Sequence, residues 1–269
     1  MRPLKFHPIL KQTLWGGERI IPYKELASGL SRVGESWELS GMPGSESVVA
    51  EGPWAGSTLS ELIGRFGAEL LGKANYARFG QEFPLLVKFI DAREDLSIQV
   101  HPDDELARKR HGKSGKCEMW YVLEAEPGAS LLTGFSRPIA PAEYERRVAD
   151  NTLTDVLNRQ AIASGDVFYL PAGRVHSIGK GSFIVEIQQS SDITYRIYDF
   201  DRRDAAGNSR ELHTELAREA IDFESSENSR ITYAPENNQE VRLVTTPYFT
   251  TSLYTLTART RCDLSLIHI

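Results

Sequence analysis

The feature that most constrains the fold is a series of strand-like stretches that do not alternate one by one with helices. We expect buried strands at 84–92 (PLLVKFIDA), 96–102 (LSIQVHP) and 116–125 (KCEMWYVLEA), and strand patterns return between 161 and 200. Helical patterns interrupt them near 58–82 and 141–160. This order predicts a mainly β protein, a barrel or sandwich with helical insertions, and not an alternating βαβ sheet.

The chain divides into one long region and one short one. Residues 1–225 are expected to form a single domain that carries both helical insertions. The polar stretch 223–230 (FESSENSR) is typical of a linker, and residues 228–262 begin a fresh β-rich segment. That segment is too short for a barrel of its own, so we interpret it as the start of a second β domain.

The last six residues, 264–269 (LSLIHI), match the peptide obtained when a common sequencing-library adapter is translated. Our hypothesis is that these residues are an artefact. On that interpretation the natural protein continues past about Cys262, and His268 has no functional meaning.

Composition and charge exclude several classes of protein. A formal net charge of −6 argues against a general nucleic-acid binder, although a few local cations would suffice for one phosphate group. Neither a signal peptide nor a run of about 18 apolar residues is found, so we expect a cytoplasmic protein that does not cross a membrane. The two cysteines, Cys117 and Cys262, fit no metal or disulfide spacing.

Polar residues alternate along two of the expected strands. In LSIQVHP the side chains of Ser97, Gln99 and His101 share one face, and in KCEMWYVL those of Lys116 and Glu118 share one face. Polar groups inside a barrel need a partner, and a metal ion would be one. Imidazole nitrogen with carboxylate and amide oxygen suits zinc and also tolerates manganese or iron.

A third motif, GDVFYLPAGRVHSI, places His176 on a strand after tight turns at Pro171 and Gly173. It resembles the second motif of the cupin superfamily, whose histidine is a metal ligand at the mouth of a jelly-roll barrel. The first cupin motif usually contains two histidines followed closely by a glutamate. Here Gln99 replaces the first histidine, and an insertion delays Glu118.

These departures point to one family, and the sequence resembles the type I mannose-6-phosphate isomerases in their shorter bacterial form. Separate stretches carry the resemblance in order over most of the chain. They are PILKQTLWGG (8–17), GESWELS (34–40), PLLVKFIDA (84–92), LSIQVHPDD (96–104), GKCEMWYVL (115–123), LPAGRVHSIG (170–179) and EIQQSSDITYRIYDFDR (186–202).

The resemblance implies an activity and a set of site residues. The activity is the interconversion of mannose 6-phosphate and fructose 6-phosphate by metal-assisted proton transfer through a cis-enediol. The implied roles are Gln99, His101, Glu118 and His176 as ligands of one zinc ion per chain, Arg196 and Lys116 as catalytic residues, and Ser97 and Lys88 as substrate-binding residues. The base stays open between Lys116 and a metal-bound water, and Arg196 could stabilise the enediolate or grip the phosphate.

Two other interpretations remain at this point. One is a catalytically silent cupin that only binds sugar phosphates, and the other is a different cupin enzyme, such as an iron oxygenase. The presence of Arg196 and Lys116 argues against the first, and Gln99 together with the YRIYDFDR segment argues against the second. We expect a monomer whose partner is a small sugar phosphate.

Overall fold

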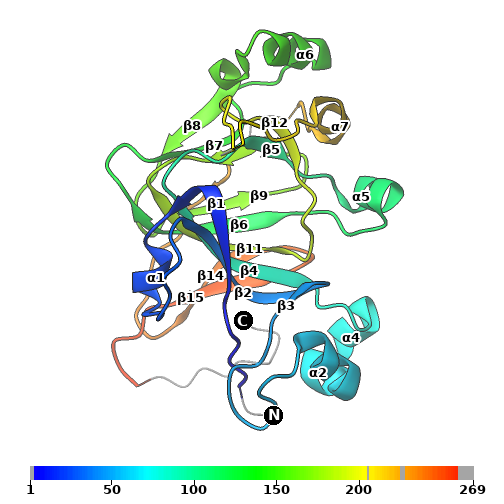
Figure 1. Cartoon of the computed structure of the whole chain (residues 1–269), viewed down its shortest axis with the longest axis vertical. Helices are drawn as coiled ribbons and strands as arrows, with labels where there is room; N and C mark the ends of the chain where they lie inside the picture. Colours follow the sequence, from blue (N-terminus) through cyan, green and yellow to red (C-terminus); the bar gives the residue numbers. More distant parts are fainter. Residues whose placement is uncertain (1–2, 205, 225–227, 260–269) are drawn as a thin grey trace.

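Two antiparallel sheets face each other and form the body of the molecule (Figure 1). The structure is a computed structural model that describes residues 3–204, 206–224 and 228–259. The mainly β fold expected from the strand patterns is confirmed. Residues 264–269, Cys262 and the end of the 228–262 segment lie outside the described residues.

The larger sheet has eight strands in the order β13-β9-β6-β11-β4-β1-β2-β3. Its strands are β1 (Ile9–Gly17), β2 (Val33–Met42), β3 (Ser45–Glu46), β4 (Leu85–Ala92), β6 (Glu118–Ala125), β9 (Val167–Leu170), β11 (Ser182–Gln189) and β13 (Arg230–Ile231). The smaller sheet has five strands in the order β12-β5-β10-β7-β8. They are β5 (Ile98–Val100), β7 (Ser130–Phe135), β8 (Leu157–Ala161), β10 (His176–Ile178) and β12 (Tyr195–Tyr198).

Short helices and one hairpin cover the outer faces of the two sheets (Figure 1). The helices are α1 (Ile20–Tyr23), α2 (Leu59–Phe66), α3 (Ala68–Leu71), α4 (Lys73–Phe79), α5 (Asp104–His111), α6 (Pro141–Ala149), the 3₁₀ helix η1 (Leu153–Val156) and α7 (Thr214–Ala220). The hairpin consists of β14 (Glu240–Thr245) and β15 (Thr250–Tyr254). Within the described residues no helix is long and apolar enough to cross a membrane.

The strand alternation expected from the sequence decides which side chains face inwards. On β6, Trp120 and Val122 pack between the two sheets, whereas Met119 and Tyr121 pack outwards beneath the hairpin. On β5, Ile98 and Val100 pack outwards against the helical side of the smaller sheet. Because side chains alternate along a strand, Glu118 and Gln99 are left on the inner faces.

The first helical insertion begins as expected and then breaks. Thr58 and Glu61 form the reciprocal hydrogen bonds of a capping box at the start of α2. Gly67 and Gly72 both have positive φ angles, 48° and 82°, and divide the insertion into three helices. Their apolar faces pack over Leu39 and form a cluster outside the larger sheet.

The prediction of a helical stretch over 141–160 is wrong in its second half. Helix α6 ends at Ala149, and Asn151 takes a left-handed conformation with φ 54°. One 3₁₀ turn follows, and residues 157–161 are strand β8, paired with β7. Local helical spacing is overridden there because the open edge of β7 offers backbone hydrogen bonds.

A buried ion pair ties the turn after β1 to the body of the larger sheet. Asp91 on β4 is buried and accepts hydrogen bonds from Arg19, from Nε at 2.7 Å and from the backbone N–H at 2.6 Å. The same guanidinium donates to the carbonyls of Gly181 and Ser182 at the start of β11. Removing the carboxylate would leave the guanidinium, whose side chain is 24% exposed, with the two carbonyls and a carboxylate oxygen of Glu126 at 4.0 Å as its partners.

We therefore expect Asp91→Ala to lower the free energy of unfolding by about 3 kcal/mol, measured by urea denaturation. Glu51→Ala, which removes the exposed Lys5–Glu51 pair, is the control and should leave the unfolding midpoint unchanged. A loss below about 1 kcal/mol in Asp91→Ala, the range of a surface pair, would contradict this interpretation.

Candidate metal centre between the two sheets

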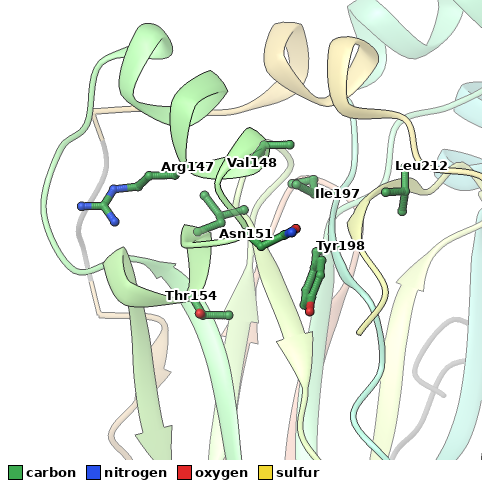
Figure 2. A pocket seen from close by; sticks show the side chains of 8 residues that line it. Arg147, Val148, Asn151, Thr154, Ile197, Tyr198 and Leu212 are labelled. Atoms are coloured by element: carbon green, nitrogen blue, oxygen red, sulfur yellow. The ribbon is translucent and has the colours of Figure 1, made fainter. Parts of the chain in front are cut away.

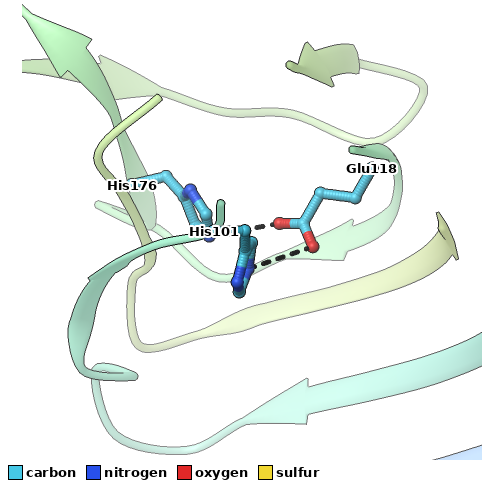
Figure 3. A group of neighbouring side chains, drawn as sticks. All are labelled: His101, Glu118 and His176. Carbon is cyan, nitrogen blue, oxygen red and sulfur yellow. Dashed lines mark ion pairs between the residues drawn. The ribbon is translucent and has the colours of Figure 1, made fainter. Parts of the chain in front are cut away.

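Three buried side chains from both sheets converge on one point between them (Figure 3). Glu118 opens β6 of the larger sheet, His176 opens β10 of the smaller sheet, and His101 directly follows β5. One ligand atom from each lies within 4.8 Å of the others. The structure thus brings together three of the four residues expected to bind metal.

Backbone hydrogen bonds fix both imidazole rings. The Nδ1 atom of His101 lies 2.7 Å from the carbonyl oxygen of Ile193, and that of His176 lies 2.8 Å from the carbonyl oxygen of Arg174. A carbonyl oxygen can only accept a hydrogen bond, so each Nδ1 carries the proton. In the neutral rings the lone pair is therefore on Nε2, the nitrogen that faces Glu118.

The charge states of the two histidines and of Glu118 favour a bound cation. Burial lowers the pKa of His101 to about 3, and the charge of Lys116 contributes to the shift. Burial also lowers the pKa of His176. Burial alone would raise the pKa of Glu118, but attraction to Lys116 and the histidines outweighs it and holds that pKa well below its usual range. Two neutral imidazoles therefore face an ionised carboxylate.

The distances show acceptor atoms pointed at one another. His101 Nε2 lies 3.5 Å from Oε2 of Glu118, and His176 Nε2 lies 3.2 Å from Oε1. Within the described chain, His101 Nε2 and both carboxylate oxygens are buried without a hydrogen bond of good geometry. Lys116 Nζ approaches Oε2 to 2.9 Å as an ion pair, but it does not separate the histidines from the carboxylate. A divalent cation fits this donor set.

Gln99 lies beside the cluster. Its Nε2 is 3.3 Å from Nε2 of His176, and its Oε1 accepts a hydrogen bond from Ser97 at 3.2 Å. Cross-strand pairing places Gln99 between His176 on β10 and Arg196 on β12. A half-turn of the amide group would direct its oxygen towards the histidine, so Gln99 can supply a fourth, oxygen ligand.

The loop before β10 positions His176. Gly173 has φ 85°, a left-handed conformation that glycine adopts without strain, and a Cβ there would come within 3.1 Å of the carbonyl oxygen of Ala220. Its N–H donates to the carbonyl oxygen of His101 at 2.9 Å. The Pro171–Gly173 turn therefore joins the backbones that carry both histidines.

A second polar group lies on the inner face of the larger sheet. Lys88 donates to Glu186 at 3.0 Å and lies 3.8 Å from a carboxylate oxygen of Glu35. Trp120 Nε1 donates to the other oxygen of Glu186, and the Trp120 ring meets His176 edge-on with centroids 5.4 Å apart. This group therefore adjoins the candidate metal centre.

Lys88 is the cation of this group. Burial alone would lower its pKa, but the carboxylates of Glu186 and Glu35 outweigh burial and raise it, so Lys88 stays an ammonium ion. The sequence prediction included Lys88 but missed both acids. The available signal was the lone acidic residue in the apolar stretch SFIVEIQQ, on the same face of the strand as inward-facing Ile184.

Arg196 lies across from Gln99 in the register of β12 and β5. Its Nη1 donates to the carbonyl oxygen of Glu211 at 3.0 Å, and its N–H donates to Nδ1 of His213 at 3.2 Å. Its neighbours Tyr195 and Ile197 lie on the outer face of the smaller sheet, in the hydrophobic cluster beneath the helices. Arg196 therefore shares the inner face with Gln99. The loop from Glu211 to His213, which the sequence did not mark, therefore holds this arginine.

In the part of the chain that the structure describes, cavities also lie outside the candidate metal cluster. One, of about 50 Å³, lies between α6, η1 and β12 and is lined by residues such as Val148 and Ile197 (Figure 2). Ile197 is on the outer face of β12, so this cavity does not open towards Glu118. Another, of about 230 Å³, lies between α4, β4 and the C-terminal hairpin. Neither is lined by the three clustered residues.

The two sheets form a cupin-like fold, and the buried cluster between them could hold a metal ion. The family "Phosphomannose isomerase type I, catalytic domain" matches residues 4–133. The chain is 39% identical over 224 residues to mannose-6-phosphate isomerase ManA of Bacillus subtilis (strain 168), covering 83% of this chain and 69% of that one. It is 37% identical over 251 residues to the mannose-6-phosphate isomerase of Streptococcus mutans, covering 92% and 77%.

Solved structures agree with this relationship. The mannose 6-phosphate isomerase of Bacillus subtilis superposes with a TM-score of 0.85 at 33% identity, covering 94% of this chain and 79% of that one. This chain belongs to the type I phosphomannose isomerase family. The sequence resemblance and the cupin-like fold that it implied are both confirmed.

The ligand set generates a direct prediction. His101→Ala and His176→Ala should each weaken zinc binding by more than about 100-fold, which exceeds the usual effect of a residue that only supports a ligand. Chelator competition measures the affinity, and circular dichroism checks that each variant is folded. The control is His7→Ala, at an exposed position. Wild-type zinc affinity in either site variant would remove that histidine from the ligand set.

Proposed function

We propose that this chain interconverts mannose 6-phosphate and fructose 6-phosphate, with one zinc ion held by Gln99, His101, Glu118 and His176. The buried cluster of two neutral histidines and one ionised glutamate carries the proposal, because it occurs in a chain of the type I phosphomannose isomerase family. When bound, the metal would supply positive charge near the oxygens of the sugar.

The reaction moves a proton between C1 and C2 of the sugar through a cis-enediol. In this proposal Lys116 holds or transfers that proton, since its Nζ lies at the edge of the cluster, 2.9 Å from Glu118. A water molecule at the metal centre is the alternative base. Ser97 is proposed to bind the sugar, because its hydroxyl lies within 3.2 Å of the amide of Gln99, at the side of the cluster.

Two cations are available for the negative charges of the substrate. Arg196 would stabilise the enediolate or grip the phosphate from the inner face of β12. Lys88 would donate to a sugar oxygen while Glu186 and Glu35 hold its ammonium group in place. Both assignments are part of the proposal.

The isomerase is favoured over a silent sugar-phosphate binder. The relatives at 37–39% identity are named mannose-6-phosphate isomerases, and the barrel retains Arg196 and Lys116 on its inner side. We also propose a monomeric, cytoplasmic enzyme in which the β14–β15 hairpin begins a second β domain. Light scattering on the purified chain tests its oligomeric state.

The activity is tested with zinc-loaded protein and mannose 6-phosphate in a coupled assay for fructose 6-phosphate. We expect steady turnover, and in D₂O we expect deuterium to enter the product at the carbon that receives the proton. Stoichiometric zinc binding without turnover would contradict the isomerase and support the silent binder.

Arg196→Ala should lower kcat by about 100-fold, as expected for the loss of a charge that acts on the transition state. Arg203→Ala is the control, because that guanidinium is exposed and donates to the carbonyl oxygen of Gly207 within its own loop. A kcat within about twofold of wild type in Arg196→Ala would rule out a catalytic role for this residue.

A further inference from the structure

One carboxylate outside the metal cluster joins the segments that carry its ligands. Oδ1 of Asp104 accepts hydrogen bonds from the N–H of Gly115 at 2.8 Å and from Nε2 of Gln189 at 3.1 Å. Oδ2 accepts a hydrogen bond from the hydroxyl of Tyr248 at 3.0 Å. These partners come from three separate parts of the chain.

Gly115 and Asp104 both lie close in the sequence to residues of the candidate site. Gly115 precedes Lys116 and Glu118, and Asp104 itself follows His101 by three residues. The N–H of Lys116 donates to the carbonyl oxygen of Pro102 at 3.1 Å, so the two segments also pair through their backbones. Asp104 therefore links the chain that leaves His101 to the chain that enters Glu118.

Gln189 extends this link to β11. Its Oε1 accepts a hydrogen bond from the N–H of Cys117 at 2.9 Å, while its Nε2 donates to Asp104. Cys117 lies between Lys116 and Glu118, so the backbone on both sides of Lys116 is fixed through Asp104 or through its partner Gln189.

The contact between these segments is close. A Cβ at Gly115 would lie 2.5 Å from the carbonyl carbon of Asp103 and 2.5 Å from the backbone nitrogen of Asp104. Only glycine allows the backbones to approach to this distance. The register between the segments is thus set by this contact and by the Asp104 hydrogen bonds.

Capping of helix α5 does not explain Asp104. Asp103 is the N-cap residue, and its Oδ1 accepts a hydrogen bond from the N–H of Leu106 at 2.8 Å. Within its own helix the Asp104 carboxylate meets the exposed Arg108 at 3.8 Å, an i,i+4 pair of small effect. Its hydrogen bonds at normal length all go to residues outside α5.

Asp104 is ionised, so both of its carboxylate oxygens can accept hydrogen bonds. Burial alone would raise its pKa, but the hydrogen bonds from Gly115, Gln189 and Tyr248 outweigh burial and lower it. Burial and the bond to Asp104 raise the pKa of Tyr248 to about 12, so the tyrosine keeps its proton and donates it to the bond.

We propose that Asp104 is a positioning residue for Lys116 and Glu118. Tyr248, through its hydrogen bond to Asp104, lets the C-terminal hairpin help to hold Asp104 in place. Tyr248 lies in the turn between β14 and β15, and the carbonyl oxygen of its neighbour Pro247 accepts a hydrogen bond from Arg78 of α4. The hairpin is therefore held at the outer side of the larger sheet with one hydroxyl directed at Asp104. The catalytic consequence rests on the proposed isomerase function.

Matched alanine variants of adjacent residues test this proposal in the full chain. Asp104→Ala should lower kcat and zinc affinity by about tenfold each, the effect of losing a group that orients metal ligands, while KM stays within about twofold. Asp103→Ala should lower Tm because the helix cap is lost, yet keep kcat and zinc affinity within about twofold of wild type. Equal losses in both variants would reduce Asp104 to a general stabilising residue and overturn the proposal.

Two further variants separate positioning from folding. Asp104→Asn keeps an oxygen that can accept from Gly115 and Gln189, so it should restore most of the kcat and zinc affinity lost in Asp104→Ala. Tyr248→Phe removes a single hydroxyl and should lower both quantities by about threefold. It keeps the test decisive if Asp104→Ala does not fold, and wild-type values in Tyr248→Phe would exclude the hairpin from the support.

Zinc affinity, measured by chelator competition, distinguishes a failure of the positioning role of Asp104 from a failure of the proposed isomerase activity. If the wild-type chain binds zinc but does not turn over mannose 6-phosphate, the proposed function fails. The positioning role is still tested in that case, because it predicts that Asp104→Ala binds zinc more weakly than Asp103→Ala. If both variants bind zinc as tightly as wild type, the positioning role fails even in an active isomerase.

Discussion

The ionised carboxylate of Glu118, enclosed between two sheets and facing two neutral imidazoles, is the interaction on which the rest of the structure depends. A buried charge of this kind is costly unless a cation or several donors compensate it. Lys116 compensates part of this negative charge through an ion pair. The lone pairs of His101 and His176 still point at the carboxylate oxygens. The two sheets therefore enclose a position suited to positive charge, and a divalent metal would satisfy the histidines and the glutamate together.

The sheets bring these groups together by register as well as by alternation. Alternation turns Gln99 and Glu118 inwards, and cross-strand pairing then sets Arg196, Gln99 and His176 in one row across the smaller sheet. On the facing sheet, Lys88 pairs with Glu186 in the register of β4 and β11. A candidate metal centre, a cation beside it and a second buried cation thus follow from the pairing of a few strands, and the proposed isomerase reaction would use these three groups.

Much of the barrel and of the metal site could be predicted from the sequence because strand alternation is a local property. It placed Lys116 and Glu118 on one face of their strand, and the two side chains form an ion pair with 2.9 Å between Nζ and Oε2. What could not be predicted depends on partners far away in the chain. Strand β8 forms because β7 offers it an edge, Glu186 matters because Lys88 lies across from it, and Asp104 matters because Gly115, Gln189 and Tyr248 converge on it. The assignment of Gln99, Arg196 and Lys116 to roles stays a prediction, since it came from a family resemblance and not from geometry.

We propose that a metal ion bound by Glu118 and the two histidines is the centre of the isomerase reaction. The most direct measurement is a titration of the metal-free protein with zinc, in which bound metal and mannose 6-phosphate turnover are followed in the same samples. The account predicts no turnover without metal, a linear rise with bound zinc, and a plateau at one zinc ion per chain. Full turnover in the metal-free protein, or a plateau reached without zinc binding, would contradict it.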